Sequence, residues 1–268
     1  MSDRTVGGYL LRAREAEVLQ SPLLLQARVA HGFSTRNGGV SRGSFASLNF
    51  GLKGGDDPDR VRLNAQRLGT CVGFDAARLF RVRQVHGDRV VQISVGQGPA
   101  DVQQQEADAL VTAHQGTAVG VATADCVPVL LAQPGGRVVG AAHAGWRGIV
   151  AGVLPAVVRR LRGMIDPGAS ERLLAAVGPC IGPCCYEVGA DVARQFARMP
   201  GVVIPGSPRP HLDLVRAAQQ SLLEAGLTPE QISVPVGLCT RCQRDLFFSY
   251  RRDGDATGHH LSVVLASP

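Results

Sequence analysis

The stretch that most constrains the fold is "ADCVPVLLAQPGGRVVGAAHAGWRG", residues 124–148, in which two apolar runs flank a Pro-Gly-Gly turn. Both runs are apolar on both faces, so a hairpin formed from them has to be buried between layers rather than half exposed. With helical segments elsewhere in the chain, this predicts a layered α/β or α+β domain. We find no repeat, linker or low-complexity tract, which predicts a single domain over residues 1–268.

Each strand of this hairpin carries one metal-binding side chain, Cys126 or His143. With Pro134 and Gly135 at the tip, the two are predicted to face each other directly, with Cβ atoms about 5 Å apart, near enough to share one metal ion. A loop of different parity would put them on opposite faces, and Pro128 can introduce a bulge. The alternative is that Cys126 is a small core thiol and His143 a buried, hydrogen-bonded imidazole.

His86 is the natural candidate for a third ligand. Residues 79–94, "LFRVRQVHGDRVVQIS", are predicted to form two strands around a turn at His86-Gly87-Asp88. Such a turn can aim the imidazole inward. Two His and one Cys are the pattern of a catalytic zinc site with a fourth position open to water or substrate. Considered alone, His86 is more typical of a surface turn.

Four further residues are candidates for substrate binding or catalysis. The hairpin leads into a predicted helix, whose first-turn amides and Arg147 can bind an anion; alternatively Arg147 is an exposed partner of an acidic residue. Trp146 can stack on a planar substrate or fill the core. Arg36 lies in a Gly-rich loop that can bind phosphate, although most such loops are turns. Asp125 acts as general acid or base only if Pro128 disturbs the pleat.

The cysteine pattern leaves two interpretations open. Seven cysteines without a secretory signal favour reduced thiols or metal ligands over disulfides. They include a cluster in "GPCIGPCCYEVG" and a C-x-x-C in "CTRCQRD", namely Cys180, Cys184, Cys185, Cys239 and Cys242. These are either free thiols near a shared surface or a second, structural zinc site. The default is free thiols, because a four-ligand site usually shows two clean paired knuckles.

Composition excludes several classes of partner. The formal net charge is +6, but the basic residues are scattered and all except Lys53 are Arg, and aromatic residues make up only 4%. An interleaved basic and aromatic surface for nucleic acid is therefore not expected. No apolar run has the length of a signal peptide or a membrane span. We expect a soluble, cytoplasmic protein without nucleic-acid or membrane partners.

Eight motifs in order, taken as a set, resemble the laccase-domain family over roughly residues 30–268; they are "STRNGGVS", "SLNFG", "RQVHG", "ADALVT", "TADCVPVLL", "AAHAGWRG", "GPCIGPCCYEVG" and "FFSYRRDG". This family was long described as multicopper polyphenol oxidases. It is now associated with zinc-dependent purine nucleoside phosphorylase and adenosine deaminase activity, and some bacterial members are called peptidoglycan editing factors. The resemblance implies an α+β fold with α/β/β/α layers, in which mixed, largely antiparallel sheets are covered by helices. It also implies a zinc site formed by His86, Cys126 and His143.

Two sets of site residues follow as expectations. Arg36, Asn49 of "SLNFG", Trp146 and Arg147 are expected to bind substrate, and Asp125 and Arg147 to act in catalysis. Two features depart from the family pattern. The usual ending close to "TGR" reads "TGHH" here, at 257–260, which puts a basic contact in doubt. Four cysteines are additions to the pattern: Cys180, Cys184, Cys185 and Cys242.

The expected function is phosphorolysis of adenosine, inosine, guanosine or methylthioadenosine, together with hydrolytic deamination of adenosine to inosine. The partners would be a nucleoside and phosphate, and the protein a monomer or homodimer. A four-copper oxidase needs about ten His ligands, whereas this chain has seven His, so copper is expected only as an adventitious substitute that gives weak phenol oxidation. The alternatives are a hydrolase for a cell-wall peptide, with Cys126 as nucleophile and His143 as base, and a zinc-stabilised binding module.

Overall fold

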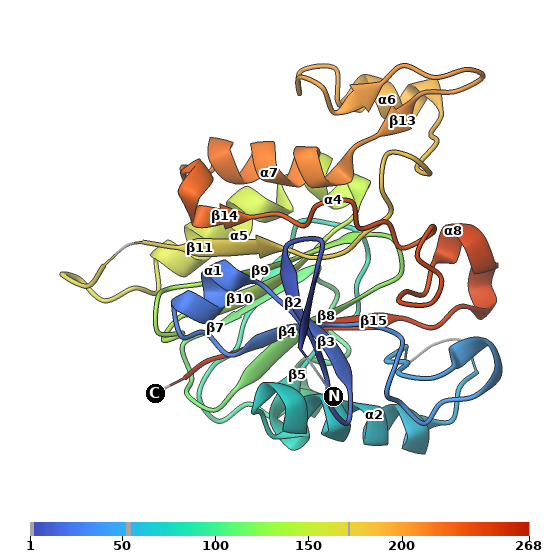
Figure 1. Ribbon diagram of the computed structural model, residues 1–268. Coiled ribbons are helices and arrows are strands. Elements are labelled where there is room, and N and C mark those ends of the chain that lie inside the picture. The colour runs from blue at the N-terminus through green and yellow to red at the C-terminus, as the bar shows by residue number, and fades with distance from the viewer. Residues whose placement is uncertain (1–2, 52–54, 171, 268) are drawn as a thin grey trace.

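Two β-sheets form the centre of the protein (Figure 1). The computed structural model describes residues 3–51, 55–170 and 172–267. The larger sheet has the strand order β1 (Arg4–Val6), β2 (Tyr9–Ala13), β3 (Glu17–Gln20), β4 (His31–Ser34), β15 (His260–Leu265), β8 (Ala118–Thr123) and β5 (Leu79–Phe80). The second sheet has the order β14 (Ile232–Ser233), β11 (Leu174–Val177), β9 (Val127–Ala132), β10 (Val139–Ala144), β7 (Ala109–Thr112) and β6 (Val90–Gln92). A small ribbon joins β12 (Val203–Ile204) and β13 (His211–Leu212).

Helices cover the outer faces of both sheets, as Figure 1 shows. The longer helices are α2 (Pro58–Val72), α5 (Val153–Arg162) and α7 (Leu214–Glu224). The shorter ones are α1 (Pro22–Gln26), α3 (Pro99–Val102), α4 (Trp146–Ala151), α6 (Ala190–Gln195) and α8 (Tyr250–Asp253). One apolar cluster joins the two sheets, a second joins the second sheet to α5 and α7, and a third joins the larger sheet to α2. The layered α/β/β/α fold that the family resemblance implies is therefore confirmed.

The helix boundaries follow local chemistry, with one correction. Helix α2 is capped at its start by Asp57, whose carboxylate accepts the Asp59 amide, and at its end by Gly73, whose φ of 97° is left-handed. The helix predicted after the hairpin is not continuous. It is interrupted at Gly152, which has φ 93°, and α5 begins directly afterwards. Pro155 lies in the first turn of α5, where its missing N–H removes no helical hydrogen bond.

The hairpin of β9 and β10 forms, but its register differs from the prediction by two residues. His143 pairs with Pro128, and Cys126 lies just before β9 on the diagonal rather than directly opposite His143. The loop comprises residues 134–137, and its backbone reverses direction at Gly135 and Gly136, whose φ values are 82° and 74°. Two consecutive left-handed glycines let the chain reverse later than at Pro134-Gly135. A shift of two residues keeps both side chains on the same face.

The predicted strand pair around His86 is split between the sheets. Strand β5 pairs in parallel with β8 in the larger sheet, whereas β6 pairs in parallel with β7 in the second sheet. The segment that carries His86 thus crosses from one sheet to the other. The segment 124–126 does the same between β8 and β9. The two crossings bring His86 and Cys126 to one place at the end of β10. In the described residues, no helix has both the length and the apolar character that a membrane span requires.

Stability is expected to fall as the pH drops from about 6.5 toward 4. The His31 imidazole is buried, accepts the Ser21 amide and faces the Val29 carbonyl, and burial lowers its pKa to about 4. Between the unfolded value of 6.5 and this value the unfolded chain binds a proton that the folded chain does not, so acid favours unfolding, by about 1.4 kcal/mol per pH unit for one such group. Urea unfolding at pH 7, 6 and 5 measures this slope.

In His31→Gln the same series should show a shallower pH dependence, because one proton-binding group of the unfolded chain is gone. His114→Gln, at a half-buried loop position, serves as the matched control. An unchanged slope in His31→Gln would contradict the assignment of a neutral His31.

Candidate functional site

The three predicted metal ligands lie together. The donor atoms of His86, Cys126 and His143 are all within 4.8 Å of one another. The Cys126 Sγ is 3.9 Å from His86 Nε2, and the two imidazole rings meet edge to face with centroids 4.7 Å apart. One sulfur and two nitrogens at such separations suit a shared zinc ion, with bonds of about 2.3 Å to sulfur and about 2.0 Å to nitrogen.

A buried carboxylate that the sequence analysis did not single out, Asp108, organises two of these ligands. Asp108 has no exposed surface and immediately precedes β7. Its carboxylate accepts the backbone amides of Val85, His86 and Gly87 at 3.2, 2.9 and 2.6 Å. These bonds stabilise the turn in which His86 has a left-handed φ of 64°. Its Oδ1 also lies 2.8 Å from His143 Nδ1.

The bond from Asp108 fixes the orientation of the His143 ring. With Nδ1 bonded to the carboxylate, Nε2 is the nitrogen left to bind a metal ion, an arrangement common in zinc proteins. Burial tends to raise the pKa of Asp108, but hydrogen bonds from His143 and the Gly87 amide outweigh it and lower the pKa. The only sequence signal for this role was the position of Asp108 as the one acidic residue in the otherwise apolar motif "ADALVT".

Local packing and charge also suit a metal ion. A Cβ added to Gly145 would lie 3.1 Å from both the Cys126 sulfur and the His86 ring, so glycine leaves the space around the donors free. Burial tends to raise the pKa of Cys126, but the His143 and His86 imidazoles overcome it and lower the pKa to about 6. A thiolate is the form that binds zinc. The donor set and its surroundings therefore fit zinc.

Asp108→Asn is expected to weaken zinc binding by about 10- to 100-fold, the usual effect of removing a carboxylate that orients a ligating His. The amide has one oxygen where the carboxylate accepts bonds through two, so either the His86 turn or His143 loses its partner. Competition with a chromogenic chelator measures the affinity. Asp88→Asn, an exposed carboxylate of the same turn, is the control. Equal zinc affinities for Asp108→Asn and the control would contradict this role.

A pocket of about 780 Å³ opens beside the three donors. Its wall is formed by Gly51, Arg81, Val82, Arg83, Gln84, His86, Gln103, Gln104, Ala122, Thr123, Ala124, Cys126, His143, Tyr250 and His259. Arg83 is ion-paired with Glu106. For Arg81, no carboxylate lies within salt-bridge distance among the described residues, and burial lowers its pKa to about 10, which leaves it charged at neutral pH. Arg81 is thus a cation available to an anionic ligand.

The departure at "TGHH" places His259 in the pocket wall. Burial lowers the pKa of His259 to about 4, with a smaller contribution from Arg81, so the imidazole is neutral at pH 7. Its buried Nδ1 has no hydrogen-bond partner among the described residues. The predicted substrate residue Asn49 is buried behind this wall. Its Oδ1 accepts the amides of Gly51 and His259, both at 2.8 Å, so Asn49 shapes the pocket without lining it.

Three other predicted substrate residues lie outside this pocket. The Arg36 guanidinium donates to the carbonyls of Ala46 and Arg244 and stacks over Phe248, which ties down its own loop. The Arg147 guanidinium lies over the Trp146 ring, 4.5 Å from its centroid. Trp146 lines a separate pocket of about 340 Å³. The substrate roles of these residues remain predictions that the geometry does not favour.

Asp125, predicted as general acid or base, is fully engaged. It has a left-handed φ of 88° at the crossing between the sheets and is 8% exposed. Its carboxylate accepts the Thr240 hydroxyl at 2.5 Å, the Ser249 hydroxyl at 3.0 Å and the Arg251 amide at 2.6 Å. These contacts anchor the segment that carries Cys126. Its catalytic role stays a prediction.

Comparison with known proteins gives a consistent set of relatives. A family model described as multi-copper polyphenol oxidoreductase laccase matches residues 30–267. The chain is 43% identical over 250 residues to a purine nucleoside phosphorylase from Deinococcus radiodurans, which covers 91% of this chain and 92% of the relative. It is 38% identical to the adenosine deaminase RL5 from an unknown prokaryotic organism, with 87% and 92% covered. The crystal structure of YlmD from Geobacillus stearothermophilus superposes with a TM-score of 0.85 at 34% identity, covering 97% of this chain and 99% of that one.

Proposed function

Because the chain belongs to the multi-copper polyphenol oxidoreductase laccase family, and relatives in the comparison are named as purine nucleoside enzymes, we propose that it is a zinc-dependent purine nucleoside phosphorylase that also deaminates adenosine. The observation that carries this proposal is the group of His86, Cys126 and His143 on the wall of a pocket that also holds an available cation, Arg81. Three protein ligands beside a pocket suit a catalytic rather than a purely structural ion, because a position is left for water or substrate.

Zinc fits this site better than the copper of the family's name. Thiolate and neutral imidazole are good zinc ligands. A four-copper oxidase would need about ten His ligands, and the chain has seven in all, of which His31 and His260 are buried and bonded to backbone groups. Copper is therefore proposed only as an adventitious substitute at the same three residues.

In phosphorolysis, different pocket residues are assigned to phosphate and to the nucleoside. In this reaction a phosphate oxygen forms a bond to ribose C1′, and the bond from C1′ to the purine nitrogen breaks with its electron pair leaving on the base. We assign phosphate binding to Arg81, whose charge is desolvated and lacks a described carboxylate partner. The unpartnered Nδ1 of His259 supplies one hydrogen bond to the nucleoside. When bound, zinc supplies Lewis-acid chemistry and lowers the pKa of water to about 7.

In deamination, water adds at C6 of the purine and ammonia leaves, so phosphate is not needed. His86, Cys126 and His143 would hold the ion beside the purine, with Asp108 fixing two of them. We assign Asp125 a positioning role, because its three hydrogen bonds hold the segment before Cys126. We further propose that residues 1–268 act as one catalytic unit in the cytoplasm, as a monomer or homodimer.

A nucleoside panel tests the proposal. Adenosine, inosine, guanosine and methylthioadenosine are incubated with zinc-loaded protein, with and without phosphate, and products are identified by mass. We expect free base and sugar 1-phosphate only when phosphate is present, and inosine from adenosine in both conditions. Absence of both reactions in zinc-loaded protein would refute the proposed function.

A hydrolase with Cys126 as nucleophile is the second candidate, favoured by the lowered pKa of Cys126 beside His143. Alkylation separates the two. In the zinc enzyme, bound zinc shields Cys126 from iodoacetamide and a chelator exposes it. In the hydrolase, Cys126 reacts whether or not zinc is supplied, and a peptide or amide substrate protects it.

A further inference from the structure

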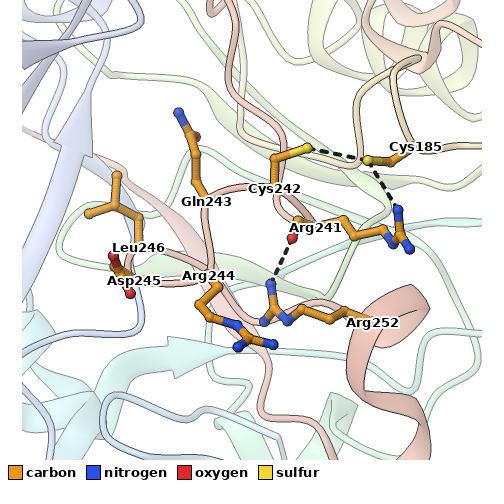
Figure 2. Close-up of a pocket in the computed structure, with 8 residues that line it drawn as sticks. All are labelled: Cys185, Arg241, Cys242, Gln243, Arg244, Asp245, Leu246 and Arg252. Atoms are coloured by element: carbon orange, nitrogen blue, oxygen red, sulfur yellow. Dashed lines mark hydrogen bonds between the residues drawn. The ribbon is translucent and has the colours of Figure 1, made fainter.

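Four cysteines that the proposed reaction does not use form a second cluster. The sulfur atoms of Cys184, Cys185, Cys239 and Cys242 all lie within 4.8 Å of one another. Cys184 and Cys242 are 3.7 Å apart and Cys185 and Cys242 are 3.2 Å apart, and Figure 2 shows the latter pair pointing toward each other. A disulfide would need about 2.05 Å. Sulfurs that share a tetrahedral zinc ion at about 2.3 Å lie about 3.8 Å apart, which the Cys184–Cys242 separation matches and the Cys185–Cys242 separation approaches from below.

The backbone holds the two cysteine pairs against each other. Cys184 and Cys185 lie in a turn at 183–185, and Cys239 and Cys242 lie at the start and the end of the segment 239–242, whose last three residues form a second turn. The chain next to them is joined by a parallel bridge between Cys180 and Cys239, in which the Thr240 amide donates to the Cys180 carbonyl at 3.0 Å. The Gln243 amide closes the second turn on the Cys239 carbonyl, also at 3.0 Å. The cluster is therefore assembled by the fold from segments more than fifty residues apart.

Donors around the cluster suit a group of thiolates. The Gly182 amide donates to the Cys239 sulfur at 3.2 Å, and the Arg241 guanidinium to the Cys185 sulfur at 3.4 Å. Figure 2 shows Arg241 reaching Cys185, whereas Arg244 and Arg252 line the same pocket, of about 650 Å³, farther from the two sulfurs. Amide and guanidinium donors offset the negative charge that four thiolates bring to a metal ion.

We propose that Cys184, Cys185, Cys239 and Cys242 bind a structural zinc ion through four thiolates, at a site separate from the His86, Cys126 and His143 group. Four protein ligands make a closed site with no position for substrate, so the role is structural. This goes beyond the proposed function and does not depend on it. The sequence favoured free thiols because the first pair is adjacent rather than spaced as a knuckle. The structure also leaves Cys180 out, since its buried thiol donates to the Ile181 carbonyl.

The position of this site relates it to the catalytic pocket. Thr240, next to Cys239, donates to the Asp125 carboxylate, and the Ile181 amide donates to the Asp125 carbonyl at 2.9 Å. Asp125 is the residue before Cys126. A zinc ion that joins the 184–185 turn to the 239–242 segment therefore stabilises the chain next to Ile181 and Thr240, two of the residues that hold Asp125. Its loss is expected to loosen the segment leading to Cys126.

Zinc counting by native mass spectrometry tests the site, with protein purified under reducing conditions. The wild type is expected to hold about two zinc ions per chain, Cys126→Ser about one, and Cys126→Ser with Cys242→Ser none. Cys71→Ser, a half-buried thiol elsewhere in the chain, is the matched control and should keep both. Cobalt added to metal-free Cys126→Ser should give the intense charge-transfer bands of four thiolates, which the double variant lacks.

Three results would overturn the site: the same zinc count in Cys242→Ser as in the wild type, cobalt spectra without thiolate bands, or a mass two hydrogens lower that reports a disulfide in the cluster. If Cys242→Ser fails to fold, alkylation of the wild type decides instead. With Cys126 replaced, zinc should protect all four thiols and a chelator should expose them; reaction in the presence of zinc would refute the site. Because these measurements do not use nucleoside turnover, they test the cysteine site even if the proposed function is wrong.

Discussion

Cys126→Ser is expected to abolish zinc binding at the His86, Cys126 and His143 group and to lower both phosphorolysis and deamination by more than about 100-fold. Serine replaces a soft ligand, whose pKa the two imidazoles lower to about 6, with a hydroxyl that stays protonated near neutral pH. With three protein ligands, losing one leaves two, too few to hold the ion beside substrate. Both reactions should fall together, because both use the same ion.

The fold of Cys126→Ser is expected to survive, because the three apolar clusters that join the layers do not depend on the metal. Zinc content and kcat/KM for each reaction are measured on the same sample, with Cys71→Ser as control. Full nucleoside turnover in Cys126→Ser would contradict the account. Loss of only a peptide or amide hydrolysis would put the cysteine nucleophile in its place.

Arg81→Ala is expected to raise the KM for phosphate by about 10- to 100-fold and to leave deamination close to the wild-type rate. A hydrogen bond to a charged group contributes about 1.5–3 kcal/mol, and Arg81 provides such donors in a partly desolvated wall. Deamination needs no phosphate, so it serves as an internal control for folding and zinc binding. Initial rates at varied phosphate concentrations measure the effect.

Arg147→Ala is the matched comparison, because the sequence predicted Arg147 as the phosphate ligand. The structure places its guanidinium on the Trp146 ring and outside the pocket, so this variant should keep its phosphate dependence. The opposite pattern, in which Arg147→Ala loses phosphate dependence and Arg81→Ala keeps it, would return the role to Arg147. Zinc content should be unchanged in both variants.

The parts of the fold that sequence could predict are those set by local pattern. The two apolar runs around the Pro-Gly-Gly turn required a buried hairpin, which β9 and β10 form. The grouping of Cys126 with His143 followed as well, since a register shift of two keeps their face. The register itself depended on whether the turn used one left-handed glycine or two. The sequence Pro-Gly-Gly is compatible with either choice.

The features of the site that the sequence did not predict depend on contacts between distant segments. Asp108 is a lone acid in an apolar motif, and its partners at 85–87 and 143 are brought to it only by the two crossings between the sheets. Arg36 resembles a phosphate ligand until its guanidinium is seen bonded to Arg244, 208 residues away. Arg81 gave no signal among so many arginines, because what distinguishes it is its place in the pocket wall.

The most direct test of the central claim is reconstitution of metal-stripped protein with zinc or with copper, followed by product identification by mass with adenosine and phosphate. Stripped protein is expected to be inactive. Zinc is expected to restore formation of inosine, adenine and ribose 1-phosphate in proportion to occupancy of the His86, Cys126 and His143 group. Copper is expected to restore neither reaction. Equal nucleoside turnover in the stripped protein, or its recovery with copper alone, would contradict the account.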